Sequence, residues 1–210
     1  MKILHIINSF EIGGAQRLLS DLLPLQSQEF YVELLVIRPL EDNALLASLR
    51  ENSIIVTSLN EYNLYKLSLV KKIRKFLKKF DIVHVHLFPS LYWVPLANMG
   101  LKTVLFYTEH STNNKRRYKK YLRFIEKIIY SKYSEIISIS EQVQANLIEW
   151  LATNNNSRFA IINNGVNLKM YESCITQRNR NKNILMISRF APSKDQNTVI
   201  RAMKQIPEDY

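Results

Sequence analysis

The sequence Lys2–Leu19, KILHIINSFEIGGAQRLL, begins with an apolar run that leads through two adjacent glycines into a segment with a different periodicity. Lys2–Ile7 is apolar at most positions, which predicts a strand covered on both faces, as in a parallel sheet. Ala15–Gln26 has the apolar spacing of a helix. The chain has only four glycines, where average usage predicts about fifteen, and Gly13 and Gly14 occupy this one turn. The stretch therefore predicts the strand, turn and helix from which parallel α/β sheets are built.

The same alternation continues along the chain. Further strands are predicted at Tyr31–Ile37, Ser53–Ser58, Asp81–His86, Lys102–Thr108, Glu135–Ser138 and Phe159–Asn163. Helices are predicted between them at Asn43–Arg50, Leu64–Lys79, Leu91–Asn98, Lys115–Ser131 and Ser140–Leu151. Seven strands that alternate with helices predict an α/β fold with a doubly wound, mostly parallel, Rossmann-like sheet.

The character of the chain changes after the last of these strands, where it becomes polar and rich in asparagine. A strand at Asn183–Ser188 and a helix at Asp195–Gln205 are then predicted, with a loop between them. We therefore expect a first domain over residues 1–170, a linker over 171–183, and the opening βα unit of a second domain over 184–210.

Cysteine usage and hydropathy exclude several classes of protein. Cys174 is the only cysteine, so no intramolecular disulfide can form, and one thiol with four histidines provides no structural zinc cluster. The apolar run at the N-terminus is too short for a secretory signal or a membrane span, which favours a cytoplasmic location.

The net charge of +11 predicts an acidic partner, which could be a nucleic acid, an anionic lipid or a phosphorylated substrate. About half of the basic residues lie in Lys71–Lys79 and Lys115–Lys132, where Glu126 is the only acid. The second run has an apolar stripe at helical spacing: Tyr118, Tyr121, Leu122, Ile125, Ile128 and Ile129. This stripe either packs on the sheet or lies on anionic lipid. No nucleic acid is expected, because no DNA- or RNA-binding motif accompanies the charge.

Ligands of open parallel sheets bind beyond the carboxyl ends of the strands. Gly13-Gly14 follows the first strand and precedes a helix N-terminus, whose free N–H groups favour an anion; a tight turn with positive φ is the alternative. A dinucleotide site is not favoured, because the G-x-G-x-x-G spacing is absent and the second strand ends at Arg38 instead of an acid. Arg189 and Lys194 follow a later strand, and this pair suits a diphosphate.

Histidines follow two other strands. His84 and His86 alternate with valine, a spacing that can suit a metal but more often reflects packing with one satisfied nitrogen. Glu109 and His110 end the next strand, where the imidazole could donate to a substrate hydroxyl or phosphate, or could serve the structure alone.

Six segments then occur in an order typical of one enzyme family. They are Gly13-Gly14-Ala15-Gln16-Arg17, His84-Val85-His86, Thr108-Glu109-His110, Ser138-Ile139-Ser140-Glu141, Asn164-Gly165-Val166-Asn167 and Ser188–Asp195. In this order, over essentially the whole chain, they resemble the GT-B glycosyltransferases of family 4.

The resemblance implies transfer of a sugar from a nucleotide-sugar donor to a glycan or lipid-linked acceptor in cell-surface polysaccharide biosynthesis, usually with retention and without a metal or other cofactor. It implies a site between two Rossmann-like domains and, with the basic runs, peripheral contact with the inner face of a membrane. The implied donor diphosphate or sugar ligands are Gly13, Gly14, Arg189 and Lys194. The implied catalytic residue is His110, and the implied acceptor-binding or cleft-lining residues are Gln16, Glu109, Asn164 and Gly165.

The sequence departs from the family pattern at three places. Ser188 and Asp195 replace glycines, Asn167 replaces an aspartate, and the family's Glu-x7-Glu segment would lie beyond Tyr210. We therefore expect these 210 residues to be an inactive fragment of an enzyme. The alternative is a non-catalytic interaction module or a subunit completed by a partner chain. The edge of the strand at 183–188 could also pair with another copy of the chain.

Overall fold

The structure is a computed structural model that describes residues 1–112, 114–153, 157–168, 184–188, 190 and 194–206. The chain divides into two units, Met1–Val166 and Asn167–Tyr210. The linker expected over 171–183 lies outside the described residues.

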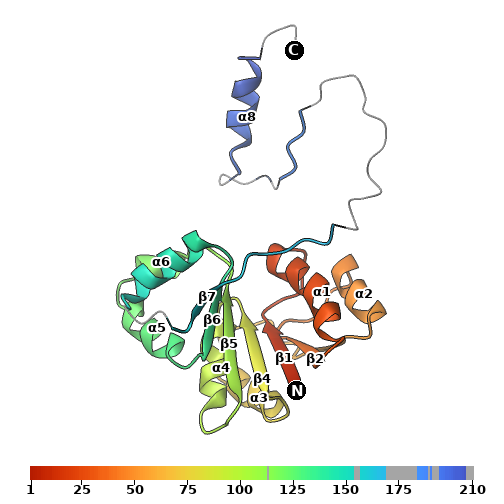
Figure 1. Cartoon of the computed structure of the whole chain (residues 1–210), viewed down its shortest axis with the longest axis vertical. Helices are drawn as coiled ribbons and strands as arrows, with labels where there is room; N and C mark the ends of the chain where they lie inside the picture. The colour runs from red at the N-terminus through yellow and green to blue at the C-terminus, as the bar shows by residue number, and fades with distance from the viewer. Residues whose placement is uncertain (113, 154–156, 169–183, 189, 191–193, 207–210) are drawn as a thin grey trace. The chain divides into compact units, whose positions relative to one another are not determined.

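The first unit is built on a seven-stranded sheet in the order β3-β2-β1-β4-β5-β6-β7 (Figure 1). Its strands are β1 (Lys2–Ile7), β2 (Tyr31–Val36), β3 (Ile55–Ser58), β4 (Ile82–His86), β5 (Val104–Glu109), β6 (Glu135–Ser138) and β7 (Phe159–Ile161). All six pairings are parallel. The α/β class and the Rossmann-like sheet predicted from the sequence are confirmed. The strand order reverses at β1, which pairs with both β2 and β4, and this switch point is where doubly wound sheets bind ligands.

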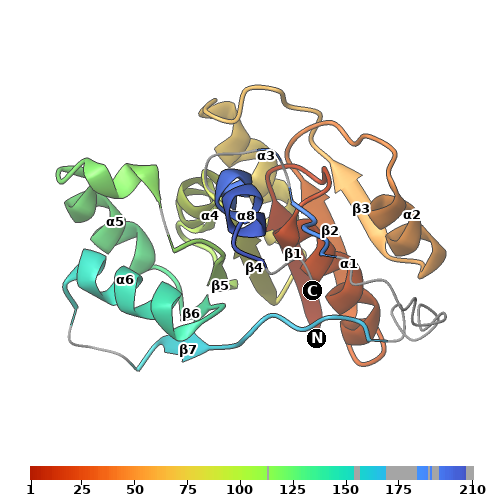
Figure 2. The ribbon, with the colours of Figure 1, turned by 90° about the horizontal axis from the view of Figure 1, so that it is seen from above.

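Helices cover both faces of this sheet, as the two views show (Figures 1 and 2). They are α1 (Gly14–Gln26), α2 (Ala44–Glu51), α3 (Ser68–Leu77), α4 (Ser90–Asn98), α5 (Leu122–Tyr130) and α6 (Glu141–Leu151), with a 3-10 helix η1 at Lys115–Tyr118. Helices α1 and α2 pack on one face over a core that includes Ile3, Ile7 and Leu19. Helices α3 to α6 pack on the other face. The sheet grows in one direction from β1 through β2 and in the other through β4, and because crossovers between parallel strands are right-handed, the helices on the two sides lie on opposite faces.

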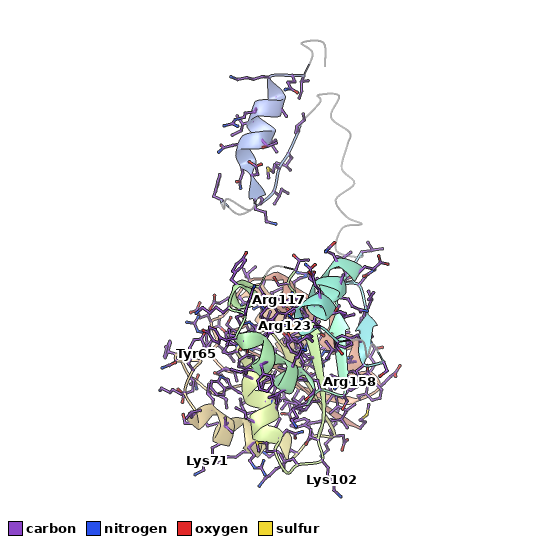
Figure 3. All side chains as sticks on the ribbon, turned by 90° about the vertical axis from the view of Figure 1, so that its left-hand side faces the viewer. Tyr65, Lys71, Lys102, Arg117, Arg123 and Arg158 are labelled. Carbon is purple, nitrogen blue, oxygen red and sulfur yellow. The ribbon has the colours of Figure 1, made fainter. Side chains whose placement is uncertain are left out.

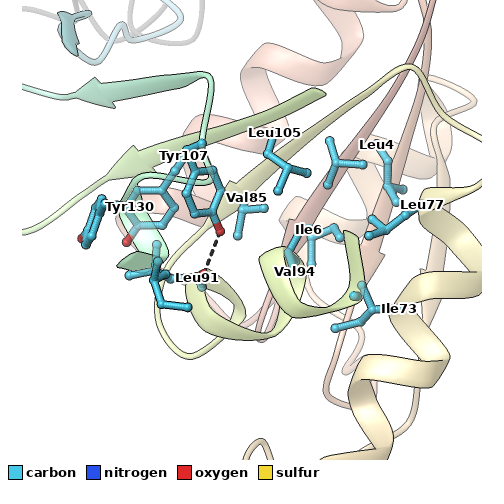
Figure 4. Packing of buried hydrophobic residues seen from close by; sticks show 14 of the residues in the cluster. Leu4, Ile6, Ile73, Leu77, Val85, Leu91, Val94, Leu105, Tyr107 and Tyr130 are labelled. Atoms are coloured by element: carbon cyan, nitrogen blue, oxygen red, sulfur yellow. Dashed lines mark hydrogen bonds between the residues drawn. The ribbon is translucent and has the colours of Figure 1, made fainter. Parts of the chain in front are cut away.

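The larger core lies beneath α3 and α4 and follows from the period of two in the strands. Leu4 and Ile6 of β1, with Val85 and Leu105, point toward Ile73, Leu77 and Val94 of the helices (Figure 4). Within the same core, the buried Tyr133 hydroxyl donates a hydrogen bond to the Leu91 carbonyl at 2.8 Å. Burial of one such leucine or isoleucine contributes about 1.5–3 kcal/mol.

The single helix predicted at Lys115–Ser131 is wrong, because the segment is broken. Lys119 has extended backbone angles of φ −101° and ψ 90° between η1 and α5. The Asn114 carboxamide accepts from Arg116 N at 3.2 Å and from Arg116 Nε at 2.9 Å. These local hydrogen bonds compete with a continuous helix.

Helix α3 also begins four residues after the predicted start at Leu64. The Asn63 side chain accepts from Tyr65 N at 2.9 Å, a local turn that again replaces helical hydrogen bonds.

In the second unit, Asp195 caps α8 (Gln196–Met203) by accepting from Thr198 N at 3.3 Å. The strand predicted at 183–188 is not found in its described part, since Ile184–Ser188 has no regular secondary structure. A strand needs a hydrogen-bonded neighbour, and in the described chain no strand pairs with this segment. None of the described helices is both long and apolar enough to span a membrane.

Candidate functional site

The candidate site lies at the carboxyl ends of β1, β4 and β5, next to the switch point. Gly13 immediately precedes α1 and has extended angles of φ −167° and ψ 170°. Gly14 is the first residue of α1, and only Gly100 among the four glycines has a positive φ, of 74°. The tight-turn alternative with positive φ is therefore wrong for the Gly13-Gly14 loop.

The two glycines differ in what a side chain would meet. A Cβ atom on Gly13 would lie 2.5 Å from Gln16 Oε1, whereas a Cβ on Gly14 would meet nothing within 4 Å. The Gln16 side chain is buried and donates from Nε2 to the Ser9 carbonyl at 3.1 Å. The Gln16 side chain, which is predicted to bind acceptor or line a cleft, thus stabilises the loop from its buried side. The lack of a side chain at Gly13 leaves space for the Gln16 carboxamide.

Helix α1 offers free backbone donors at this point. Its N-cap residue makes no side-chain hydrogen bond, and its first turn contains no acidic residue. The first N–H groups of a helix have no partner inside the helix, and the helix dipole adds partial positive charge there. The exposed start at Gly14 therefore suits an anionic group.

Asn8, at the end of β1, joins this loop to the loop after β4. Its Oδ1 accepts from Ser90 N at 3.2 Å and from Ser90 Oγ at 2.6 Å, and its Nδ2 donates to the Phe88 carbonyl. Asn8 and Ser90 are both buried. The sequence reasoning missed both, although a polar residue directly after a buried strand was a visible signal.

All four histidines of the chain gather on the α1 face of the sheet. His5 Nδ1 lies 3.0 Å from His86 Nε2, and His86 Nδ1 lies 3.1 Å from His110 Nε2. His84 Nε2 lies 2.7 Å from Thr108 Oγ1. The parallel register places His5 opposite His84, so the cluster follows from strand pairing.

Burial keeps this cluster neutral. Loss of solvent lowers the pKa of His5 and of His110 from 6.5 to about 4. The pKa values of His84 and His86 also fall well below 6.5, chiefly through burial and then through the neighbouring imidazoles. The ligand atoms of His5, His84 and His86 lie within 4.8 Å of one another, yet both nitrogens of His5 and of His86 already have hydrogen-bond partners.

Glu109 and His110 are adjacent in sequence but face opposite sides of the sheet. The Glu109 carboxylate is buried, and it accepts from the Tyr130 hydroxyl at 2.9 Å and from Arg117 Nη2 at 3.2 Å. Burial raises the pKa of Glu109 although the nearby arginines oppose the rise. The Glu109 side chain thus contacts Tyr130 of α5 and Arg117 of η1, and its acceptor-binding or cleft-lining role stays a prediction.

A second buried carboxylate, Glu126, lies near it. Glu126 pairs with Arg116 at 2.9 Å and accepts from the Tyr92 hydroxyl at 2.7 Å and from Trp150 Nε1 at 2.6 Å. The Arg116 guanidinium also lies 4.2 Å from the centre of the Phe88 ring. A cavity of about 360 Å³ opens beside these residues, and none of the predicted site residues lines it.

The remaining predicted residues are not brought to this edge by any described contact. Asn164 and Gly165 follow β7 and are exposed. Lys194 is exposed in the second unit, and Arg189 lies outside the described residues. The roles assigned to these four residues stay predictions.

Comparisons with solved structures agree on the fold. Anabaena Alr3699/HepE in complex with UDP and glucose matches with a TM-score of 0.76 and 19% identity, over 99% of this chain and 58% of that chain. HepE in complex with UDP-glucose matches over the same shares with a TM-score of 0.74 and 20% identity. The lipopolysaccharide outer core galactosyltransferase WaaB, in its apo form, gives 0.59 and 17%, over 80% of this chain and 47% of that one.

The chain thus spans a little over half the length of the HepE chain that it matches. A comparison with curated protein sequences finds no match. The sequence profile of Glycosyltransferase Family 4, by contrast, matches residues 12–170, which is most of the chain. This match includes the Gly13-Gly14 loop and strands β2 to β7, with His84, His86 and His110, whereas β1 and His5 lie before it. The protein belongs to glycosyltransferase family 4, the GT-B family that its ordered motifs resemble.

Proposed function

We propose that this protein takes part in transferring a sugar, with retention and without a metal or other cofactor, from a nucleotide-sugar donor to a glycan or lipid-linked acceptor of cell-surface polysaccharide. The observation that carries the proposal is the uncapped N-terminus of α1, bare of side chain at Gly14, in a chain of this family. The HepE structures in complex with UDP and glucose or with UDP-glucose support a donor of the same class.

In this proposal the donor diphosphate approaches the α1 N–H groups at Gly14. Charge develops on the diphosphate as the glycosidic bond to it breaks, and fixed donors stabilise that charge more in the transition state than in the bound substrate. Arg189 and Lys194 would hold the same diphosphate from the second domain. His110, neutral at physiological pH, would contact the transferred sugar.

Replacing Gly14 with valine tests the proposal. Titration with UDP-glucose, followed by amide NMR, should shift the resonances of Gly14 and Ala15 in the wild type, and the valine should weaken this binding by about tenfold or more. Because a Cβ at Gly14 meets nothing within 4 Å, the free energy of unfolding should change by less than about 0.5 kcal/mol.

Ala47→Val is the matched control, since Ala47 is an exposed helical residue of α2. It should leave UDP-glucose binding unchanged. Equal binding of UDP-glucose by the wild type and Gly14→Val would show that the diphosphate does not bind at this loop. We further propose that the 210 residues alone give no transfer with nucleotide sugars; transfer restored by an added partner chain would favour the split-subunit alternative.

A second proposal concerns the membrane, and it rests on the surface of η1 and α5. Of the predicted stripe only Ile129 is buried, while Tyr118, Tyr121, Ile125 and Ile128 are exposed, as is Phe124 at 72%. Lys119, Lys120 and Lys127 are exposed in the same segment, and Figure 3 shows Lys71, Lys102, Arg123 and Arg158 on the side of the first unit that carries α3, α4 and α5. Exposed aromatic and aliphatic side chains beside cations are typical of helices that lie on anionic lipid.

We expect the protein to bind anionic liposomes, to ignore neutral ones and to be released at high salt. Phe124→Ser should weaken binding about tenfold or more, because a phenylalanine contributes about 1.5–3 kcal/mol when it is buried. Sedimentation with liposomes measures this effect. Tyr62→Ser is the control, because it replaces an aromatic residue that is 77% exposed in the loop between β3 and α3. Binding that is indifferent to lipid charge would contradict the proposal.

A further inference from the structure

A line of hydrogen bonds runs through the histidine cluster from the end of α1 to the carboxyl edge of the sheet. It begins at Gln26, the last residue of α1, whose Oε1 lies 2.8 Å from His5 Nε2. It continues from His5 Nδ1 to His86 Nε2 at 3.0 Å and from His86 Nδ1 to His110 Nε2 at 3.1 Å. In both His5 and His86, Nε2 faces the Gln26 end of the line and Nδ1 faces the His110 end.

This direction follows from the chemistry of the first member. A carboxamide oxygen can only accept, so His5 Nε2 carries a proton, and a neutral imidazole has just one such proton. His5 Nδ1 must then accept from His86 Nε2, and His86 Nδ1 must accept from His110 Nε2. The His110 proton is thereby placed on Nε2, which leaves Nδ1 with a lone pair. In the described chain no group donates to this Nδ1.

We infer that Gln26, His5 and His86 are positioning residues that set the tautomer of His110 and make its Nδ1 a hydrogen-bond acceptor. The pKa values lowered by burial keep all three imidazoles neutral, as this ordering requires. His84 lies outside the line, because its Nε2 pairs with Thr108.

The tautomer determines what His110 can contact. An imidazole acceptor takes a hydrogen bond from a hydroxyl group, whereas a phosphate oxygen needs a donor. This step rests on the proposed function. An accepting Nδ1 predicts that His110 binds a hydroxyl group of the sugar and that it does not bind the diphosphate. It narrows the two options left by the sequence, hydroxyl or phosphate, to the first.

The decisive variant is Gln26→Arg, which replaces an acceptor by a side chain that can only donate. The arginine should force the proton of His5 onto Nδ1, and His86 and His110 should follow in turn. Long-range ¹H–¹⁵N correlation spectra of histidine-labelled protein report which nitrogen carries the proton. We expect the Nε2–H form at His5, His86 and His110 in the wild type and the Nδ1–H form at all three in Gln26→Arg.

Three controls distinguish a tautomer change that passes along the line of hydrogen bonds from a general disturbance of the structure. Gln28→Arg makes the same change at an exposed residue just beyond α1 and should leave every tautomer as in the wild type. His84 should be unaffected in all variants. In Gln26→Arg combined with His86→Phe, His5 should switch while His110 does not, and the backbone amide spectrum confirms that each variant is folded.

The inference is overturned if His110 keeps its Nε2 proton while His5 switches, or if wild-type His110 carries its proton on Nδ1. Titration with UDP-glucose and, separately, inorganic pyrophosphate tests the ligand. UDP-glucose should shift the His110 Nδ1 resonance in the wild type, and pyrophosphate should do so only in Gln26→Arg. A complete tautomer switch with no response to UDP-glucose would support the line of hydrogen bonds and contradict the proposed function.

Discussion

Replacing Glu126 with leucine should lower the free energy of unfolding by about 3–5 kcal/mol, as expected when one partner of a buried ion pair is removed. The carboxylate is fully buried and holds Arg116, whose side chain is only 11% exposed. It also accepts from the Tyr92 hydroxyl and the Trp150 indole. Leucine would leave a buried cation without its counter-ion and two donors without an acceptor. Urea denaturation of the wild type and the variant measures the difference.

Two variants show whether charge is the cause. Glu126→Gln keeps an acceptor for Tyr92 or Trp150 and should lose less stability than leucine, since it leaves fewer donors unsatisfied. Lys127→Leu, at an exposed position of the same helix, should change stability by less than about 0.5 kcal/mol. A loss below about 1 kcal/mol for Glu126→Leu would mean that Arg116 escapes to solvent at little cost.

The contrast between β1 and the segment 115–131 shows what the sequence could reveal. An apolar run such as Lys2–Ile7 indicates a strand that is buried on both faces, and the sequence therefore predicts both end residues of β1 correctly. Glu126 was visible as the lone acid of a basic run, but its role depends on Tyr92 and Trp150, which lie in other helices. The break itself involves a local signal, because Asn114 directly before the run accepts from Arg116. The burial of Glu126, by contrast, depends on tertiary contacts that no pattern within the run could predict.

The histidine cluster shows a second limit to what the sequence alone can predict. The alternation of His84 and His86 with valine placed both side chains on one face of a strand. His5 joins them because β1 pairs with β4 in a register that sets His5 opposite His84. A doubly wound fold makes the adjacency of β1 and β4 foreseeable, whereas register depends on the whole packed sheet. Gln26 reaches His5 only through the packing of α1.

Acidification should destabilise the protein steeply through these histidines. The pKa values of His5 and His110 fall from 6.5 to about 4 on folding, so between these values the unfolded chain binds more protons. The free energy of unfolding therefore rises with pH in this window. The stabilisation is complete above about pH 6.5 and is lost as the pH falls toward 4. By pH 5 each of these histidines accounts for a loss of at most about 2 kcal/mol.

His84 and His86 act in the same direction, because their pKa values are lowered as well. Glu109 acts against them: its pKa is raised on folding, so the folded state holds that proton more tightly as the pH falls. The four histidines destabilise the folded protein in acid and Glu109 alone opposes them, so we expect a net loss of stability as the pH falls.

Urea denaturation at a series of pH values from 5 to 8 measures this dependence. The chain suits the measurement because none of its four histidines lies on an exposed surface that would titrate alike in both states. His5→Phe should flatten the slope between pH 5 and 6.5, since it removes one proton-binding site from the unfolded chain. An equal slope in the wild type and in His5→Phe would show that folding does not lower the pKa of His5, and it would contradict the buried, neutral His5 on which the ordered line from Gln26 to His110 depends.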